Sequence, residues 1–239
     1  MLEGYADFVL PTLTAGMRVL DVGCGDGAVT LCLGTAAHPI QVLGVDPDEG
    51  AIALARKAAA RASVTTVDFL AGDPRHLPLP ESVVDVVFAH ALLEHVRDPQ
   101  VILRELARVL VPGGTLALST ADWGRAKLRP RTANVEAALR GRHVLHRRRG
   151  GDPFAGRRVG DWVLRAGFRN VRERVRHYPD IAYHDLAQQV EDELAAALRS
   201  PDVGPDPQLA SAARSAWMWV RSGQGEFAQC WVEVLATAP

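Results

Sequence analysis

The chain has 239 residues, of which 48% are hydrophobic, and a formal net charge of −1 at pH 7. This length fits one domain, or one domain with a lid, and the near-neutral charge argues against a nucleic acid or an anionic membrane as partner. Cys24, Cys32 and Cys230 have no Cys-x-x-Cys spacing, which argues against a disulfide framework or a structural zinc site.

The first residues, Met-Leu-Glu-Gly-Tyr-Ala-Asp, lack the basic region and apolar run of a signal peptide. No uninterrupted apolar run approaches the ~20 residues that a membrane span needs. We therefore expect a soluble, cytoplasmic protein with no membrane partner.

In chain order, we expect a short helix over 2–13, a buried strand over 19–22, a glycine turn, and a helix that opens at Ala28 and closes at 38–39. Strands over 40–45, 64–70, 83–88 and 115–119 then alternate with helices over 51–62 and 100–110. This alternation predicts an α/β fold with a doubly wound parallel sheet. Late strands over 171–175 and 227–235 complete the sheet, and a linker at 201–207 separates helices over 182–199 and 208–221.

The glycine turn indicates a nucleotide-like ligand, because a strand, such a turn and a helix N-terminus bring a ligand against backbone. Gly23-x-Gly25-x-x-Ala28 also satisfies the dinucleotide fingerprint, with Asp46 near the position of a ribose acid, so spacing leaves NAD and S-adenosylmethionine both open. Asp21 and Asp26 would repel a pyrophosphate but suit a sulfonium and an ammonium group. Charge therefore favours S-adenosylmethionine.

Four polar residues, Asp21, Asp46, Asp73 and His90, stand at the ends of expected strands. Ligands in doubly wound sheets bind beyond the carboxyl ends of the strands. We therefore expect these four side chains to converge on one site.

Six motifs in order carry a resemblance to a known family. They are Val-Leu-Asp-Val-Gly-Cys-Gly-Asp-Gly at 19–27, Val-Asp-Pro-Asp at 45–48, Ala-Gly-Asp at 71–73, Leu-Pro-Leu-Pro at 77–80, Leu-Leu-Glu-His-Val at 92–96 and Arg-Val-Leu-Val-Pro-Gly-Gly at 108–114. With them the chain resembles the class I S-adenosylmethionine-dependent methyltransferases, and within these the small-molecule group that includes the ubiquinone and menaquinone biosynthesis enzymes. The resemblance covers about residues 10–121 and is looser from Gly151 onward.

The resemblance implies a seven-stranded sheet of order 3-2-1-4-5-7-6, with strand seven antiparallel and helices on both faces. It also implies a single domain over 1–239, with residues 10–121 as its cofactor-binding half. Residues 122–239 would form a substrate or lid region that completes the sheet.

The implied activity is transfer of a methyl group from S-adenosylmethionine to a small organic acceptor, such as a specialised metabolite or a quinone-like compound, with S-adenosylhomocysteine released. By the resemblance, the turn glycines would face the methionine moiety, Asp46 would accept from the ribose hydroxyls, and Asp73 from the adenine amino group. The implied cofactor-binding set is Asp21, Gly23, Gly25, Gly27, Asp46, Pro47, Gly72, Asp73, Pro74, Ala89, His90 and His95.

Two features depart from the family pattern. Pro74 has no N–H to donate to the adenine ring, so adenine would be held through Arg75 or His76. The N-terminal capping helices are reduced to about a dozen residues. The lid would then come from the segment after Trp123, or from a partner subunit in a homodimer.

His90 is the candidate catalytic base, since a neutral imidazole beside the methyl group could take the proton of a hydroxyl acceptor. Its alternative role is contact with the cofactor through its backbone alone. His95 suits a structural or cofactor-shell role. Trp123 and Phe154 are candidates for an acceptor pocket, with core packing as the alternative. We see no carboxylate and histidine cluster with metal-ligand spacing, and expect no metal.

The basic run at 140–149 could bind an anionic acceptor or RNA, or form an exposed helix end; the lack of interleaved aromatic residues counts against RNA. A second function also stays open. A protein of this fold could bind S-adenosylmethionine without methyl transfer, as a scaffold or as the catalyst of another rearrangement.

Overall fold

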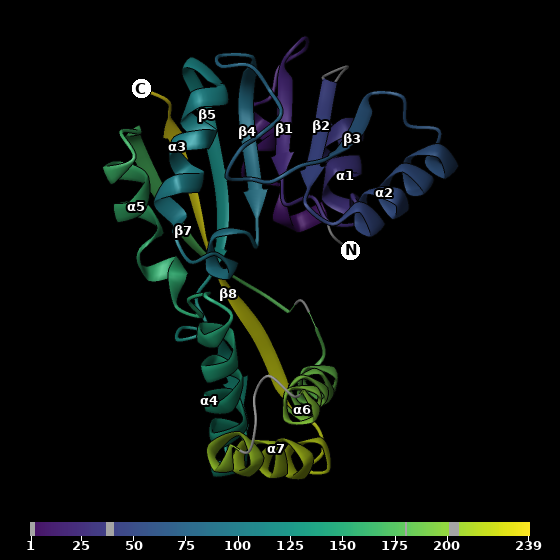
Figure 1. Ribbon diagram of the computed structural model, residues 1–239, viewed down its shortest axis with the longest axis vertical. Coiled ribbons are helices and arrows are strands. Elements are labelled where there is room, and N and C mark those ends of the chain that lie inside the picture. The colour runs from purple at the N-terminus through teal and green to yellow at the C-terminus, as the bar shows by residue number, and fades with distance from the viewer. Residues whose placement is uncertain (1–2, 37–40, 180, 201–205) are drawn as a thin grey trace.

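The structure, a computed structural model, describes residues 3–36, 41–179, 181–200 and 206–239. Figure 1 shows an upper lobe built on a sheet and a lower lobe of helices, with one long strand running through both. The expected helix end at 38–39 and most of the expected linker lie outside the described residues.

The sheet of the upper lobe has the predicted topology. Its parallel strands lie in the order β3 (Val67–Ala71), β2 (Gln41–Asp46), β1 (Arg18–Val22), β4 (Val84–His90) and β5 (Leu110–Ala121). The long β8 (Glu226–Thr237) follows antiparallel to β5, and β7 (Arg169–Tyr178) pairs with the other edge of β8. Since β7 and β8 are the expected sixth and seventh strands, the order 3-2-1-4-5-7-6 is confirmed.

One strand was not expected. The short β6 (Lys127–Arg129) pairs antiparallel with the first residues of β8, below the end of β5. Three residues are too few for a clear alternation of polar and apolar side chains, so the sequence gives little sign of this strand.

Helices cover both faces of the sheet. On one face, α3 (Pro99–Val109) and α5 (Val159–Arg165) share a core with Leu20 and Val22 of β1. On the other face, Val19 packs with Leu33 of α1 (Ala28–Ala36), as the alternation of a strand requires. The helix α2 (Glu49–Ala62) packs through its buried face against β3.

The expected helix over 2–13 is wrong. The segment forms two 3-10 turns, Glu3–Tyr5 and Leu10–Thr12, joined by turn residues. Pro11 cannot donate a helical hydrogen bond, and Ala6, Val9 and Leu13 are held instead by burial against the sheet. Packing thus fixes this segment without a regular helix.

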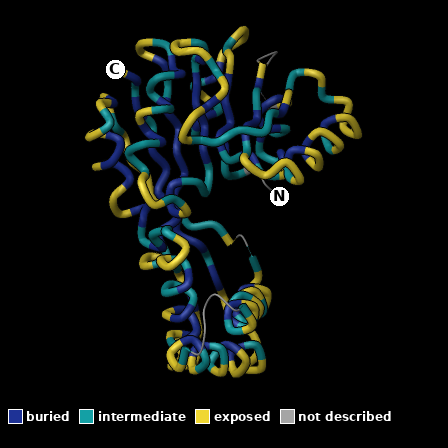
Figure 2. The backbone as a smooth tube through the Cα atoms, viewed as in Figure 1, coloured by how far each residue is buried: buried dark blue, intermediate teal, exposed yellow. Residues whose placement is uncertain are grey.

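The lower lobe has a hydrophobic core of its own. Its helices α4 (Ala133–Arg148), α6 (Tyr183–Arg199) and α7 (Pro207–Val220) bury their inner faces against one another and against β6 and the start of β8 (Figure 2). Trp219 is 1% exposed within this core, whereas Trp217 is 46% exposed. The arginines near the end of α4 lie largely at the surface, as the exposed-helix-end interpretation of the basic run predicts.

No helix among the described residues is both long and apolar enough to cross a membrane.

Candidate cofactor and acceptor site

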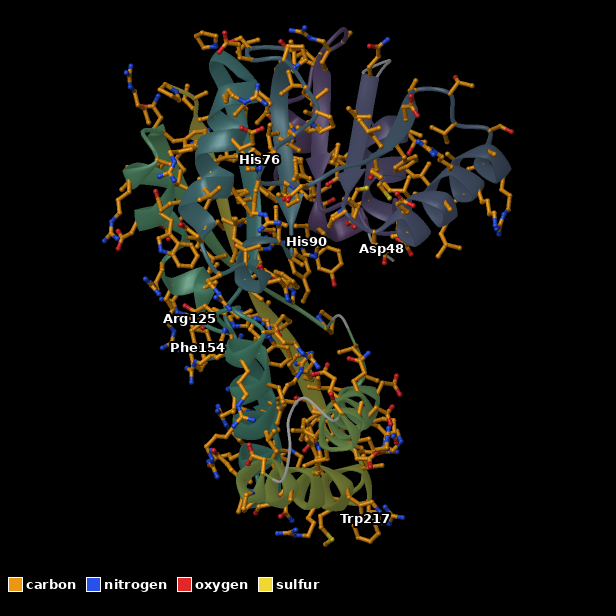
Figure 3. The ribbon with its side chains drawn as sticks, in the orientation of Figure 1. Asp48, His76, His90, Arg125, Phe154 and Trp217 are labelled. Atoms are coloured by element: carbon orange, nitrogen blue, oxygen red, sulfur yellow. The ribbon has the colours of Figure 1, made fainter. Side chains whose placement is uncertain are left out.

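The strands β1, β2 and β4 deliver their carboxyl ends to the edge of the upper lobe that faces the lower lobe, where Figure 3 shows His90. The glycine turn follows β1 at this edge. Gly23, Gly25 and Gly27 have φ angles of +79°, +54° and +79°, which favour glycine over residues with a side chain.

The three turn glycines have different surroundings. A Cβ on Gly27 would lie 2.7 Å from the Phe69 ring and 2.8 Å from Ala55, so this residue lets the turn pack against α2 and β3. Gly25 faces open space, and Gly23 lines the cavity described next. Gly27 thus allows close packing of the turn, and its contact with the methionine moiety stays a prediction.

A cavity of about 210 Å³, here called the turn cavity, opens beside these residues. Asp21 lines it, is only 2% exposed, and accepts a 2.6 Å hydrogen bond from the hydroxyl of Thr30. Burial raises the pKa of Asp21 to about 7, and the nearby Asp46 carboxylate adds to the effect. A cationic ligand group in this cavity would stabilise the ionised Asp21 carboxylate and lower its pKa again. The other lining residues are Gly23, Cys24, Asp26, Ala28, Val29, Phe88, His90 and Ala91.

Asp46, at the end of β2, braces the turn. Its Oδ2 accepts a 2.9 Å hydrogen bond from the N–H of Gly25, and its Oδ1 accepts one of 2.9 Å from Asp48. Each carboxylate oxygen can accept more than one hydrogen bond, so both keep capacity for ligand hydroxyls. The structure thus brings Asp21 and Asp46 to the same turn, as predicted from the strand ends.

His90 packs against two aromatic rings at the end of β4. The Tyr5 and Trp231 ring centroids lie 4.4 Å and 4.3 Å from that of His90. Its Nδ1 is buried without a hydrogen-bond partner among the described residues, and burial lowers the pKa of the imidazole to about 4. His90 is therefore neutral at physiological pH and able to accept a proton.

A second cavity, the proline cavity, measures about 540 Å³ and includes Pro47, Asp73, Pro74 and His95 in its lining. The Arg75 guanidinium donates hydrogen bonds to both carboxylate oxygens of Asp73, at 3.0 Å from Nε to Oδ1 and 2.7 Å from Nη2 to Oδ2. This ion pair lowers the pKa of Asp73. The expected adenine-binding acid is thus covered by the residue that follows Pro74.

Five residues of the expected cofactor set line neither cavity: Gly25, Gly27 and Asp46, described above, and Gly72 and Ala89. A Cβ on Gly72 would lie 3.1 Å from both Pro78 and Val45, so this glycine lets the chain pack closely. The side chain of Ala89 is buried in the core on the α3 face.

A third cavity of about 210 Å³, the inner cavity, lies between the lobes. It shares Ala91 with the turn cavity, and its Trp231 packs against His90. Trp123 lines it, as predicted for an acceptor pocket, whereas Phe154 does not. Phe154 instead lies between the guanidinium groups of Arg147 and Arg157, 5.2 Å and 5.1 Å from its ring centroid.

The inner cavity continues toward a wider groove of about 990 Å³ along β6 and the start of β8. Ile181 and Phe227 line both spaces.

Four residues of this region were not among the expected site residues. Tyr5 and Trp231 hold His90, and Glu94 and Arg142 line the inner cavity. Burial raises the pKa of Glu94 to about 7. Glu94 could have been found from its motif at 92–96 and Arg142 from the basic run at 140–149, but no local pattern points Trp231 toward the site.

Cys24 lines the turn cavity, yet burial beside Asp21 raises the pKa of its thiol to about 12. A thiol at that pKa is not a nucleophile at neutral pH. Within the described ranges, no group of three or more His, Cys, Asp or Glu side chains has the arrangement of a metal site.

Comparison with known proteins finds matches chiefly in the first part of the chain. The family model described as "Methyltransferase domain" matches residues 20–118. The chain is 39% identical over 126 residues to the 27-O-demethylrifamycin SV methyltransferase of Amycolatopsis mediterranei, a match that covers 52% of this chain and 44% of that protein. It is 38% identical over 114 residues to the ubiquinone biosynthesis O-methyltransferase of Marinobacter nauticus, covering 45% of each. The chain thus spans less than half the length of these two relatives.

The fold has solved counterparts. The crystal structure of the [4+2]-cyclase SpnF matches 99% of this chain and 81% of its own, at 23% identity and a TM-score of 0.63. That likeness shows the fold alone. The motifs, the acidic glycine turn and the family match agree, and residues 20–118 are similar to the family described as "Methyltransferase domain".

Proposed function

We propose that the protein transfers the methyl group of S-adenosylmethionine to an oxygen of a small organic acceptor. The observation that carries this proposal is the acidic turn cavity, where Asp21 and the neutral His90 line one space. The two relatives compared above are named for O-methylation, which supports oxygen as the target.

The chain's residues fit the cofactor. Asp21 and Asp26 give the turn cavity the negative charge that a sulfonium and an ammonium group require. Asp46 holds the turn and offers acceptors to a ribose, and the proline cavity lies beyond Pro47 for the adenine end. When bound, S-adenosylmethionine supplies an activated methyl group.

The remaining work is alignment and proton removal. The inner cavity would hold the acceptor beside Ala91 and Trp231, next to His90 and away from water. His90 would accept the proton of the acceptor hydroxyl at Nδ1, its unpartnered nitrogen. Its low pKa keeps it in the accepting form and places its contribution near the lower end of the ~10²- to 10⁴-fold range for a general base.

The test uses the chain with S-adenosylmethionine and a panel of hydroxylated acceptors. S-adenosylhomocysteine and an acceptor heavier by one methylene should form together. Release of neither, under conditions in which the cofactor binds, would refute methyl transfer by this chain.

A second function has its own observation. The SpnF structure, named for a cyclase, shares this fold over 99% of the chain. Conversion of an acceptor with no S-adenosylhomocysteine formed would favour a rearrangement that uses the bound cofactor as a structural element. Stoichiometric S-adenosylhomocysteine would exclude it.

A further inference from the structure

The inner cavity joins five segments that are distant in sequence. Its walls come from the turn after β4, the end of β5, α4, the start of α6 and the middle of β8. A side chain on this wall can therefore contact an acceptor held between the two lobes.

Three polar atoms of the wall lack a hydrogen-bond partner among the described residues: Oε2 of Glu94, Oε1 of Gln229 and Nη1 of Arg142. Glu94 and Gln229 are only 2% and 3% exposed. An unpaired buried polar atom costs about 1–3 kcal/mol, more if charged. A ligand in this cavity is well placed to supply the missing partners.

The surroundings fix the direction of each hydrogen bond. Oε1 of Glu94 already accepts from the N–H of Ala121 at 3.2 Å, which leaves Oε2 as a free acceptor when the carboxyl group is ionised, above its pKa of about 7. The Nε and Nη2 atoms of Arg142 bind Glu193 at 3.1 Å and 3.2 Å, which leaves Nη1 as a free donor. The ligand must therefore bring hydroxyl donors to Glu94 and Gln229 and an oxygen acceptor to Arg142.

Charge and shape narrow the ligand further. Glu193 neutralises Arg142, so the cavity offers no uncompensated cation to a carboxylate, and a neutral carbonyl oxygen suits Nη1 better. The aromatic side chains of the wall are Trp123, Phe227 and Trp231, and the first two stack at 5.7 Å with an interplanar angle of 15°. Trp123 also packs under the Arg142 guanidinium, 4.3 Å from its ring centroid, so a flat ring of the ligand would pack against Trp231.

We propose that the inner cavity recognises the acceptor as a planar hydroxylated ring bearing a neutral carbonyl oxygen, with Glu94 and Gln229 accepting from hydroxyl groups and Arg142 donating to the carbonyl. This inference rests on the proposed function, because it takes the inner cavity as the acceptor site.

The test is calorimetric titration of the full chain, saturated with S-adenosylhomocysteine, with four single-ring probes: dihydroxyacetophenone, dihydroxybenzoate, catechol and acetophenone. Dihydroxyacetophenone should bind about 5-fold more tightly than catechol, which lacks the carbonyl group and so one hydrogen bond worth ~1 kcal/mol. It should bind about 30-fold more tightly than acetophenone, which lacks both hydroxyl groups and so ~2 kcal/mol. Dihydroxybenzoate should bind more weakly than dihydroxyacetophenone.

Variants assign the contacts. Glu94→Gln replaces the free acceptor by a donor of the same shape, so it should weaken catechol binding and spare acetophenone. Arg142→Met should do the reverse. Arg140→Met is the matched control, because Arg140 lies on the same helix with its side chain 67% exposed and should leave all four affinities unchanged.

Each other outcome is decisive. Three results would overturn the inference. They are equal affinities for probes with and without the hydroxyl or carbonyl groups, tighter binding of dihydroxybenzoate than of dihydroxyacetophenone, and equal effects of Arg142→Met and Arg140→Met on probe affinity. Binding of S-adenosylhomocysteine with no binding of any probe would overturn it and leave the proposed function intact. Failure to bind S-adenosylhomocysteine at all would instead refute the proposed function.

Discussion

The hydroxyl of Thr30 on α1 donates a 2.6 Å hydrogen bond to the buried carboxylate of Asp21 on β1, across the glycine turn. This hydrogen bond offsets only part of the penalty of burial, since the pKa of Asp21 still rises to about 7. The turn therefore holds an acid whose ionised form is costly until a cation arrives.

Asp21→Asn should stabilise the ligand-free protein at alkaline pH and weaken S-adenosylmethionine binding about tenfold. The folded-state pKa of about 7 exceeds the ordinary value of 3.8, so the folded state binds more protons between those values. Stability contributed by the protonated form is complete below pH 4 and is lost as pH rises through 7. Removing the charge should raise the free energy of unfolding by on the order of 2–4 kcal/mol at pH 8 and by almost nothing at pH 4.

Thermal unfolding at both pH values, with and without cofactor, measures this effect. Equal melting temperatures of the native and variant proteins at pH 8, together with unchanged affinity, would show that the charge of Asp21 affects neither stability nor cofactor binding.

Asp46→Ala should weaken S-adenosylmethionine binding about 10- to 100-fold, because two charge-assisted hydrogen bonds of ~1.5 kcal/mol each are lost, less what water returns. The matched control is Asp48→Ala. Asp48 caps α2 by accepting from the N–H groups of Gly50 and Ala51, so its loss should cost about 1 kcal/mol of stability and no affinity. Calorimetry and thermal unfolding separate the two variants, and a folded Asp46→Ala protein with native affinity would contradict the role of Asp46.

His90→Ala should lower turnover about 10²-fold and leave S-adenosylmethionine affinity within about threefold. Since burial moves its pKa from 6.5 to about 4, His90 should add no step to the rate between pH 5.5 and 8, and a fall in rate should begin near pH 4. The exposed His184 provides the control variant, His184→Ala, which should retain full turnover.

Steady-state kinetics across pH tests this assignment. Full turnover in the His90→Ala variant places the base elsewhere, and a collapse of cofactor affinity assigns His90 to the binding shell. A rate step near pH 6.5 that the variant loses would contradict the buried imidazole.

Much of this site could be predicted because its residues belong to regular strands. Asp21 is the penultimate residue of β1, and Asp46 and His90 end β2 and β4. The apolar runs of these strands are clear, and parallel strands share one ligand edge. The N-terminal turns could not be predicted, since packing against the sheet, which the sequence does not display, holds them. Arg142 and Gln229 reach the inner cavity only through the placement of α4 and β8 in the lower lobe.

Arg75→Ala should change S-adenosylhomocysteine affinity by less than about fivefold. The Arg75–Asp73 pair is largely exposed, with side chains 65% and 39% accessible, so its net worth is ~0–1 kcal/mol. Asp73→Ala should weaken S-adenosylhomocysteine binding about tenfold if, in the native protein, the Asp73 carboxylate accepts a hydrogen bond from the adenine amino group. An equal loss in both variants would show that Arg75 itself holds the ring.

The most direct measurement of the central claim is calorimetric titration of the ligand-free chain with S-adenosylmethionine and, separately, with NAD. The acidic turn predicts saturable, one-site binding of S-adenosylmethionine and no detectable binding of NAD, because Asp21 and Asp26 oppose a pyrophosphate. Micromolar affinity for NAD with none for S-adenosylmethionine would contradict it.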